Sequence, residues 1–322
     1  MSKQSSCGCH AGESCEKTGL RSIVMVGNPN VGKSALFNRL TGSYVTVSNY
    51  PGTTVEVSQG KCKIDGEEFF VEDTPGMYSL LPITEEERVS RDILFAGKAD
   101  VVLCVVDAKN LKRMLTLTLQ LVEASLPVIL VLNMMDEANR LGIQIDEGEL
   151  EKRLGIPVVG ISALSGKGVD ILKSRIRSYH RQETTAEVFY GDAVEGAVNA
   201  LAPLMPAEAG LSQRALALLF IQNDPNIAAL VRSTEVSSPD FLESTLAELD
   251  KKLTEPVSYT VPMMQHNTAE DICNEAFNPP AERKRSFAQR LSDWTMEPLT
   301  GIPILLIVLY YGLYKFVGEF GA

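Results

Sequence analysis

The sequence predicts an α/β fold for the first half of the chain, and three observations lead to this prediction. Runs typical of β-strands alternate with runs typical of helices between Arg21 and about Arg181. Two of the β-type runs, Val101 to Val106 and Val128 to Leu132, are continuously apolar, as expected of parallel strands that helices cover on both faces. A loop with a glycine at each end joins the first β-type run to the first helix-type run. In domains of this class, ligands gather at the carboxyl ends of the strands.

The predicted sheet is mixed and mostly parallel, and its strands follow one another along residues 20–184. The β-type runs are Ser22 to Val26, Gly60 to Asp73, Val101 to Val106, Val128 to Leu132 and Val158 to Ile161.

After Thr184 the composition changes to Ala- and Leu-rich segments that prolines interrupt. Their apolar residues recur at helical spacing, which predicts a small all-α domain over residues 185–274 with its own packed core. The clearest segments are Ala193 to Leu204, Gln213 to Ile221 and Pro239 to Leu253.

Composition limits the classes of partner. The chain has 322 residues, 45% hydrophobic and 22% charged, a balance typical of a globular protein of about two domains. The net charge of −11 argues against a nucleic acid partner, because binding a polyanion requires Lys and Arg to displace counterions. Residues 1–18 contain no apolar run, so we expect no signal peptide and a cytosolic N-terminal part with reduced thiols.

Residues 1–19 form a Cys-rich tail. Cys7, Cys9, His10 and Cys15 are soft ligands that could bind zinc or iron. Their spacing matches no standard zinc finger, and a disordered tail is the favoured interpretation. The other cysteines stand in apolar or mixed contexts and are predicted to be packing residues: Cys62, Cys104 and Cys273.

The loop between the first strand and the first helix predicts a phosphate-binding site. Its glycines let successive backbone N–H groups point inward, and the following helix presents the positive end of its dipole. Lys33 can reach the outer phosphates, and the Ser34 hydroxyl can ligate magnesium. The loop reads Gly27-Asn28-Pro29-Asn30-Val31-Gly32-Lys33-Ser34.

Two further segments are expected beside the phosphates. Asp73-Thr74-Pro75-Gly76 follows an apolar run, so Asp73 should hold magnesium through water while the Gly76 N–H detects a terminal phosphate. The second is Pro51-Gly52-Thr53-Thr54-Val55-Glu56, in which Thr54 is the candidate switch hydroxyl for the magnesium shell and Thr53 is the competing candidate.

The segment Asn133-Met134-Met135-Asp136 predicts recognition of guanine. It follows the apolar run Val128 to Leu132, and a carboxylate there can accept both N1–H and N2–H of guanine, a donor pair that adenine lacks. The turn Ser162-Ala163-Leu164, after the last predicted strand, can supply a backbone N–H to the guanine carbonyl oxygen. These motifs, in this order and each at a strand end, predict a P-loop GTPase domain of the Ras-like type.

Hydrolysis is expected to be slow. Met77 occupies the position at which Ras-type enzymes carry a glutamine that orients water. Asn30 could instead help to hold a monovalent cation near the phosphates, and a turn-stabilising side chain is the equal alternative for this residue.

The C-terminal part predicts entry into a membrane. Residues 275–297 include the basic Arg283-Lys284-Arg285, and an uncharged run from Pro298 to Tyr314 follows. We expect a transmembrane helix over residues 298–322, with its N-terminal side in the cytosol. The alternative is a buried core helix.

On these motifs the chain resembles the bacterial ferrous-iron transporter family FeoB over nearly its whole length. The resemblance is carried by Gly27 to Ser34, Pro51 to Glu56, Asp73 to Leu80, Asn133 to Asp136 and the stretch from Trp294 to Pro303.

This resemblance implies that Thr54 is the switch threonine and that Asn30 helps to bind an activating potassium ion. It also implies that the helical domain relays the nucleotide state to a permease in the bacterial inner membrane, with iron(II) as cargo. The permease needs many spans and this chain stops after the first, so we expect a fragment or a split gene product whose partners are the lipid membrane and the remaining spans. A homo-oligomer is a further possible assembly of this chain.

Two other readings compete with this one. A soluble regulatory GTPase of ribosome or tRNA maturation would need a basic RNA-binding appendage, whereas the residues after Thr184 are roughly charge-balanced and end in an apolar run. A metal-binding scaffold in which the nucleotide is only structural would show no GTP turnover.

Overall fold

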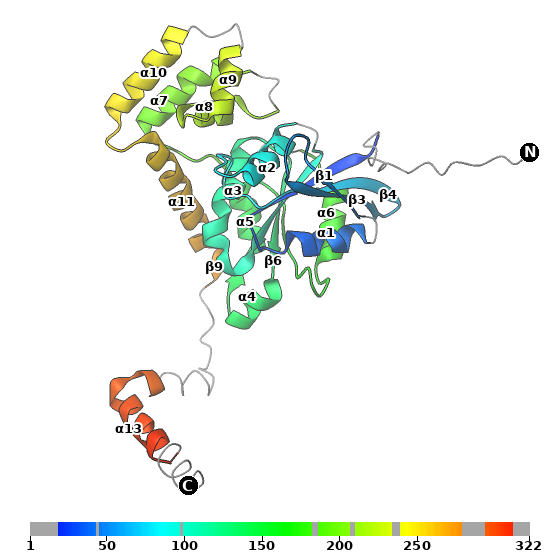
Figure 1. The fold of residues 1–322 in the computed structure, drawn as a ribbon, viewed down its shortest axis with the longest axis vertical. Helices are drawn as coiled ribbons and strands as arrows, with labels where there is room; N and C mark the ends of the chain where they lie inside the picture. The colour runs from blue at the N-terminus through cyan, green and yellow to red at the C-terminus, as the bar shows by residue number, and fades with distance from the viewer. Residues whose placement is uncertain are drawn as a thin grey trace, which may run out of the picture. The chain divides into compact units, whose positions relative to one another are not determined.

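The computed structural model describes residues 19–42, 45–96, 99–181, 186–206, 210–233, 239–278 and 294–311 (Figure 1). The chain divides into two units, Met1–Asn278 and Pro279–Ala322. The first contains the sheet and a helical domain, and the second contains helix α13.

The central sheet has seven strands in the order β2-β3-β4-β1-β5-β6-β8. All pairs between β4 and β8 are parallel, and the β2–β3 and β3–β4 pairs are antiparallel. The predicted mixed, mostly parallel α/β fold is therefore confirmed. The strands are β1 (Arg21–Val26), β2 (Val45–Asn49), β3 (Glu56–Ile64), β4 (Glu67–Asp73), β5 (Val101–Asp107), β6 (Val128–Asn133) and β8 (Val158–Gly160).

Two strands differ from the prediction. The run Gly60 to Asp73, predicted as one strand, is a hairpin in which Asp65 and Gly66 form the turn with φ of 48° and 92°. Two consecutive positive φ values are typical of the tight turns that join antiparallel strands, and Asp-Gly is a preferred pair for them. Strand β2 was not predicted; its alternation is short, with only Val45 and Val47 apolar, and all five of its residues are exposed.

Helices cover both faces of the sheet, and successive strand residues face opposite sides. In β1, Ile23 and Met25 pack toward α1 (Lys33–Thr41) and α6 (Val169–Arg177). Val24 and Val26 pack into a second core that α2 (Glu85–Phe95), α3 (Leu111–Glu123) and α5 (Glu147–Leu154) share with the helical domain. The short helix α4 (Met135–Leu141) follows β6.

One long helix of the helical domain packs against the sheet domain, and side-chain contacts such as Arg91–Asp224 and Arg214–Glu123 add to this interface. Helix α11 (Val257–Ala276) lies along α3, and its end forms a two-stranded sheet in which β9 (Phe277–Asn278) pairs with β7 (Gln144–Ile145) (Figure 1). The other helices are α7 (Asp192–Leu201), α8 (Gln213–Ile221), α9 (Pro225–Ser233) and α10 (Pro239–Lys252).

The second unit contains α13 (Pro298–Val308), whose apolar side chains such as Leu305 and Leu306 are exposed. Within the described residues, no helix has both the length and the apolar character needed to cross a membrane. The predicted span extends to residue 322, and its last part, residues 312–322, lies outside the described residues. The predicted Cys-rich tail (apart from Gly19) and most of the basic segment 275–297 lie outside them as well.

Candidate nucleotide-binding site

The loop after β1 is built so that only glycine fits at its two ends. Gly27 has φ +150°, and a Cβ there would lie 2.1 Å from the carbonyl oxygen of Val105. Gly32 has φ +84°, and a Cβ there would lie 2.4 Å from Nδ2 of Asn133. The loop backbone is thus pressed against the ends of β5 and β6, which leaves its other side for a ligand.

Helix α1 begins at Lys33 without a side chain that caps its first N–H groups. Such groups suit an anion. The Lys33 side chain is buried, and its Nζ donates to the carbonyl oxygen of Gly27 at 3.3 Å. Burial lowers the pKa of this ammonium, and Asp73 partly opposes that shift. A phosphate would supply the counter-charge that burial makes favourable.

Asp73, at the end of β4, lies beside Ser34 in an arrangement that could bind a cation between the two side chains. Its Oδ2 accepts a hydrogen bond from the Ser34 hydroxyl at 3.0 Å. Its Oδ1 is buried and finds no hydrogen-bond partner among the described residues. Burial raises the pKa of this carboxyl group, while Lys33 and the Ser34 hydrogen bond lower it. A hydroxyl beside an under-satisfied carboxylate is an all-oxygen donor set that fits Mg²⁺.

The segment after Asp73 lies directly against the phosphate loop. A Cβ on Gly76 would lie 2.7 Å from Cγ of Pro29 and 2.9 Å from its backbone nitrogen, so the approach requires glycine. The Met77 N–H donates to the carbonyl oxygen of Gly27 at 3.1 Å, and the Met77 side chain is fully buried. Met77 therefore cannot orient a water molecule, as the sequence indicated. The Thr74 hydroxyl donates to the Met25 carbonyl oxygen at 2.9 Å, which makes this residue structural.

A cavity of about 790 Å³ brings these segments together. Thr54 lines it and Thr53 does not. The Thr53 hydroxyl instead donates to the Tyr50 carbonyl oxygen at 3.0 Å and accepts from the Val55 N–H at 3.2 Å, so it stabilises the turn. The lining residues are Pro29, Asn30, Lys33, Ser34, Thr54, Val55, Glu56, Ser58, Asp73, Thr74, Pro75, Gly76, Thr84, Glu85 and Glu86.

Three of the lining residues belong to the start of α2 and were missed by sequence reasoning. Thr84 caps α2 in a reciprocal arrangement with Glu87, a Thr-x-x-Glu capping box that is a recognisable start signal for a helix. The signal could have placed Thr84, Glu85 and Glu86 at the amino end of a helix, although not beside this cavity.

Asn133 and Asp136 lie at the end of the candidate site where the base is expected. Nδ2 of Asn133 donates to the Val31 carbonyl oxygen at 2.8 Å, and its Oδ1 accepts from the Ala163 N–H at 2.9 Å. This side chain therefore ties the phosphate loop to the turn at residues 162–164. Oδ1 of Asp136 accepts from the Ser162 hydroxyl at 2.7 Å, a bond that lowers the pKa of the carboxyl group. The Asp136 side chain is 52% exposed and can meet a base.

The turn at residues 162–164 offers a narrower choice of donors than predicted. The Ser162 N–H donates to the Lys167 carbonyl oxygen at 2.9 Å, and the Ala163 N–H is taken by Asn133. The N–H groups of Ser162 and Ala163 already have acceptors within the protein. The Leu164 N–H is therefore the predicted donor that best suits a guanine carbonyl oxygen. Arg39 of α1 braces the turn by donating to the carbonyl oxygens of Ala163 and Leu164, a contact that no local sequence signal indicates.

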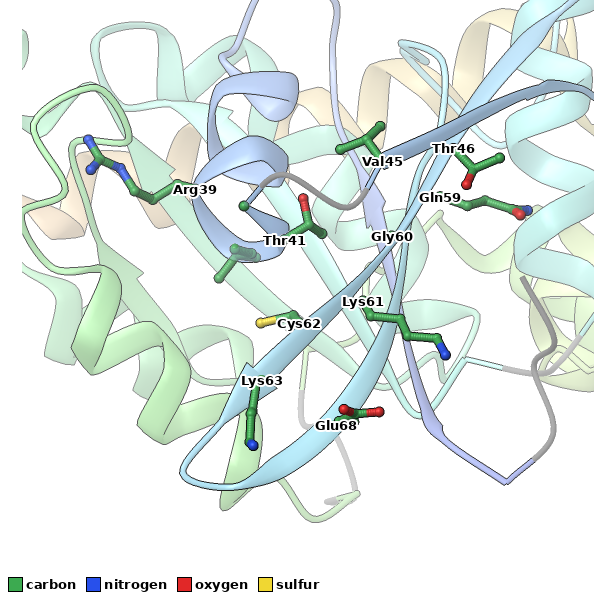
Figure 2. A pocket seen from close by; sticks show the side chains of 12 residues that line it. Arg39, Thr41, Val45, Thr46, Gln59, Gly60, Lys61, Cys62, Lys63 and Glu68 are labelled. Carbon is green, nitrogen blue, oxygen red and sulfur yellow. The ribbon is translucent and has the colours of Figure 1, made fainter. Parts of the chain in front are cut away.

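A larger cavity, about 840 Å³, lies at the open edge of the sheet beside the end of α1 (Figure 2). It contains none of the residues predicted to bind a nucleotide. Its labelled lining residues in Figure 2 are Arg39, Thr41, Val45, Thr46, Gln59, Gly60, Lys61, Cys62, Lys63 and Glu68. The smaller cavity is the candidate nucleotide site because it has the phosphate-loop geometry.

A phosphate loop after β1, a hydroxyl–carboxylate pair for a cation and a carboxylate beyond β6 define the class of P-loop GTP-binding domains. The sequence matches the family model for ferrous iron transport protein B over residues 21–176 and the model for the FeoB cytosolic helical domain over residues 190–278. The chain belongs to the FeoB family and corresponds to its N-terminal G domain and cytosolic helical domain.

Relatives agree with this assignment. The Fe(2+) transporter FeoB of Escherichia coli (strain K12) is 33% identical over 293 residues, which cover 89% of this chain and 37% of the relative. The chain thus spans little more than a third of the curated relatives it matches.

Solved structures of cytosolic FeoB parts match as well. The cytosolic domain of the T. maritima FeoB iron transporter in apo form is 31% identical, with a TM-score of 0.69, and the match covers 80% of this chain and 100% of that one. A GDP-bound mutant of the S. thermophilus FeoB G-domain is 33% identical with a TM-score of 0.72 over the same shares of the two chains. The T. maritima domain has also been solved in a GMPPNP form, with 31% identity, a TM-score of 0.69 and shares of 81% and 100%.

Proposed function

We propose that this chain binds and slowly hydrolyses GTP as the cytosolic module of a ferrous iron transporter, and that its nucleotide state regulates iron uptake. One observation carries the proposal: Lys33, the Ser34–Asp73 pair and Thr54 meet around one cavity, and Asn133 ties the phosphate loop beside it to the turn whose Ser162 holds Asp136. The GDP and GMPPNP forms of the FeoB relatives support the same ligand class.

Each residue takes a role that its surroundings suit. Lys33 neutralises the outer phosphates, and Ser34 and Thr54 would hold Mg²⁺ with Asp73 acting through water. Gly76 lines the same cavity, and its N–H would donate to the terminal phosphate. Bound Mg²⁺ would supply charge neutralisation at the phosphates.

Asn30 is the candidate for potassium. It lies in the cavity with a φ of 62°, a conformation that asparagine tolerates in turns. The buried Met77 occupies the place of a catalytic glutamine and cannot replace it. A monovalent cation at Asn30 would supply positive charge near the phosphates.

Two paths of side-chain contacts support a relay from the phosphate end of the site to the helical domain. Arg91, on α2, pairs with Asp224, before α9, and both side chains are 1% exposed. A second path starts at the Leu80 N–H, which donates to Oε1 of Gln120 at 2.8 Å. Nε2 of Gln120 donates to Oε1 of Gln265 on α11 at 2.7 Å. Movement of the segment after Gly76 would therefore reach α11 through side-chain contacts.

The apolar run that begins at Pro298 is the proposed entry into the bacterial inner membrane, with the cytosolic domains before it. The exposed apolar surface of α13 supports this placement. The remaining spans of the transporter are the proposed partners. Iron(II) is the proposed cargo rather than a resident cofactor, and the described residues contain no cluster of three or more His, Cys, Asp or Glu side chains that could hold a metal ion.

The test is GTP turnover by the full chain in Mg²⁺ and potassium, compared with a Lys33→Ala variant. We expect phosphate release by the wild-type chain, GTP preferred over ATP, and release reduced to background in the variant. Equal release by both proteins would refute the assignment of the site. For transport, the chain joined to the remaining spans should restore iron(II) uptake to a bacterium that lacks its own ferrous transporter, and Lys33→Ala should prevent this.

A further inference from the structure

Helix α5 satisfies the outward-facing N–H groups of an edge strand. Strand β8 lies at the end of the sheet and is paired there with β6. Oε2 of Glu147 accepts from the Gly160 N–H at 3.0 Å, and Oε1 of Glu151 accepts from the Val158 N–H at 2.9 Å. The two glutamates are four residues apart and therefore lie on one face of α5. Their carboxylates take the place of a neighbouring strand.

The two carboxylates hold opposite ends of this strand. Val158 is its first residue, and Gly160 is its last. Ile161 follows Gly160, and its carbonyl oxygen accepts from the Met135 N–H at 3.1 Å. Ser162 comes next and donates to Asp136. The bond from Glu147 is therefore two residues away from the turn that orients Asp136, whereas the bond from Glu151 is at the far end.

The Glu147 carboxylate packs closely against Gly160. A Cβ at this glycine would lie 2.4 Å from Oε1 of Glu147 and 3.2 Å from Cγ of Met135. On another side, a Cβ at Gly168 would lie 2.4 Å from the Gly160 carbonyl oxygen. The peptide before the turn is thus enclosed between α5, the start of α4 and the start of α6.

We propose that Glu147 is a positioning residue for guanine recognition. It does not touch the base; it fixes the end of β8 so that Ser162 holds the Asp136 carboxylate in place. Without Glu147, the Gly160 N–H loses its acceptor, and the residues that lead into the turn are held by fewer bonds. The base would then be held less tightly and the nucleotide released faster. The inference rests on the proposed guanine-nucleotide binding of this site.

The experiment measures dissociation of fluorescently labelled GDP from the full chain by stopped flow. Losing a hydrogen bond to a charged acceptor predicts dissociation about three- to tenfold faster in Glu147→Ala. Glu147→Gln keeps an acceptor oxygen and should restore most of the wild-type rate. Glu151→Ala is the control, because it removes the same kind of bond from the same strand away from the turn, together with the ion pair from Glu151 to Arg175, and it should stay within about twofold of wild type. GTP turnover at saturating GTP should be unchanged in Glu147→Ala, with a raised KM.

A second variant reaches the same bond by another route. Gly160→Ala displaces the Glu147 carboxylate without removing it, and it should release GDP about as fast as Glu147→Ala. The inference is overturned if Glu147→Ala and Glu151→Ala speed release equally, because the effect would then reflect strand stability alone. It is also overturned if Glu147→Ala releases GDP at the wild-type rate. A wild-type chain that fails to bind labelled GDP would refute the proposed function itself.

Discussion

The buried ion pair between Arg91 and Asp224 gives the sharpest prediction for the joint between α2 and the helical domain. Both side chains are 1% exposed, and they come from segments 133 residues apart. Removing one partner of a buried pair leaves an uncompensated charge and costs roughly 3–5 kcal/mol. This is a large share of the roughly 5–15 kcal/mol that stabilises a typical folded domain.

Asp224 has a second role that the variants must separate. Its Oδ1 accepts from the N–H groups of Asn226 and Ile227 at 2.9 and 3.0 Å, so it also caps α9. Asp224→Asn keeps an equally good cap while removing the charge, and it should lose most of the 3–5 kcal/mol. Asp224→Ala should lose about 1 kcal/mol more.

The double variant Arg91→Met with Asp224→Asn should recover most of the loss. It removes both charges from the interior, and a buried pair contributes little over an apolar replacement. Nε of Arg91 is buried without a hydrogen-bond partner among the described residues, which makes this recovery easier. The assay is urea unfolding of the full chain without nucleotide, analysed as a double-mutant cycle. Single variants within about 1 kcal/mol of wild type, or losses that simply add in the double variant, would refute the reasoning.

Four further predictions concern the site and the second unit. Asp136→Asn should weaken GDP binding at least tenfold and favour xanthosine nucleotides, which calorimetry with both diphosphates would measure; unchanged GDP affinity would contradict the guanine assignment. Because folding raises the pKa of Asp73 above 3.8, the nucleotide-free protein should lose stability as pH rises through the interval between 3.8 and the raised value. Asp73→Asn should remove this loss, as melting curves at several pH values in EDTA would show, and it should prevent Mg²⁺-dependent nucleotide binding, which calorimetry with GDP in the presence and absence of Mg²⁺ would measure. GTP turnover should be faster in potassium than in sodium, and Asn30→Ala should abolish the difference without lowering the sodium rate; equal rates for the wild-type chain would exclude a potassium site. The full chain should float with lipid vesicles, and Leu306→Glu, which places a charge in the apolar run, should reduce flotation; a wild-type chain that stays in the dense fraction would contradict membrane entry.

The positions of the buried parallel strands along the chain and the residues of the phosphate loop could be predicted because their signals are local. Continuous apolar runs such as that of β6 indicate buried parallel strands. The spacing of Gly27, Gly32 and Lys33 indicates a phosphate-binding loop without further context. The run from Gly60 to Asp73 has β-type residues on both sides of Asp65-Gly66, so this dipeptide is the local signal that divides it into β3 and β4. Thr53 and Thr54 could not be separated by spacing, since only the folded turn shows which hydroxyl bonds to Tyr50.

The contacts that position the base end of the site could not have been predicted from one sequence. Arg39 lies 124 residues from Ala163, and Glu147 meets Gly160 across a helix and a strand edge. The residues around Arg39 and Glu147 do not indicate these contacts, because each of the two is an ordinary charged residue on a helix. Such contacts depend on the register of the sheet and on how α1 and α5 lie against it.

The pairing of β9 with β7 decides where the polypeptide leaves its cytosolic part. The Asp146 N–H donates to the Ala276 carbonyl oxygen at 2.9 Å, and Arg153 meets Glu275 at 3.1 Å, so the end of α11 is fastened beside α5. The end of α11 is therefore held at the corner that follows α4, the helix that carries Asp136, and away from the loops that line the cavity around Lys33.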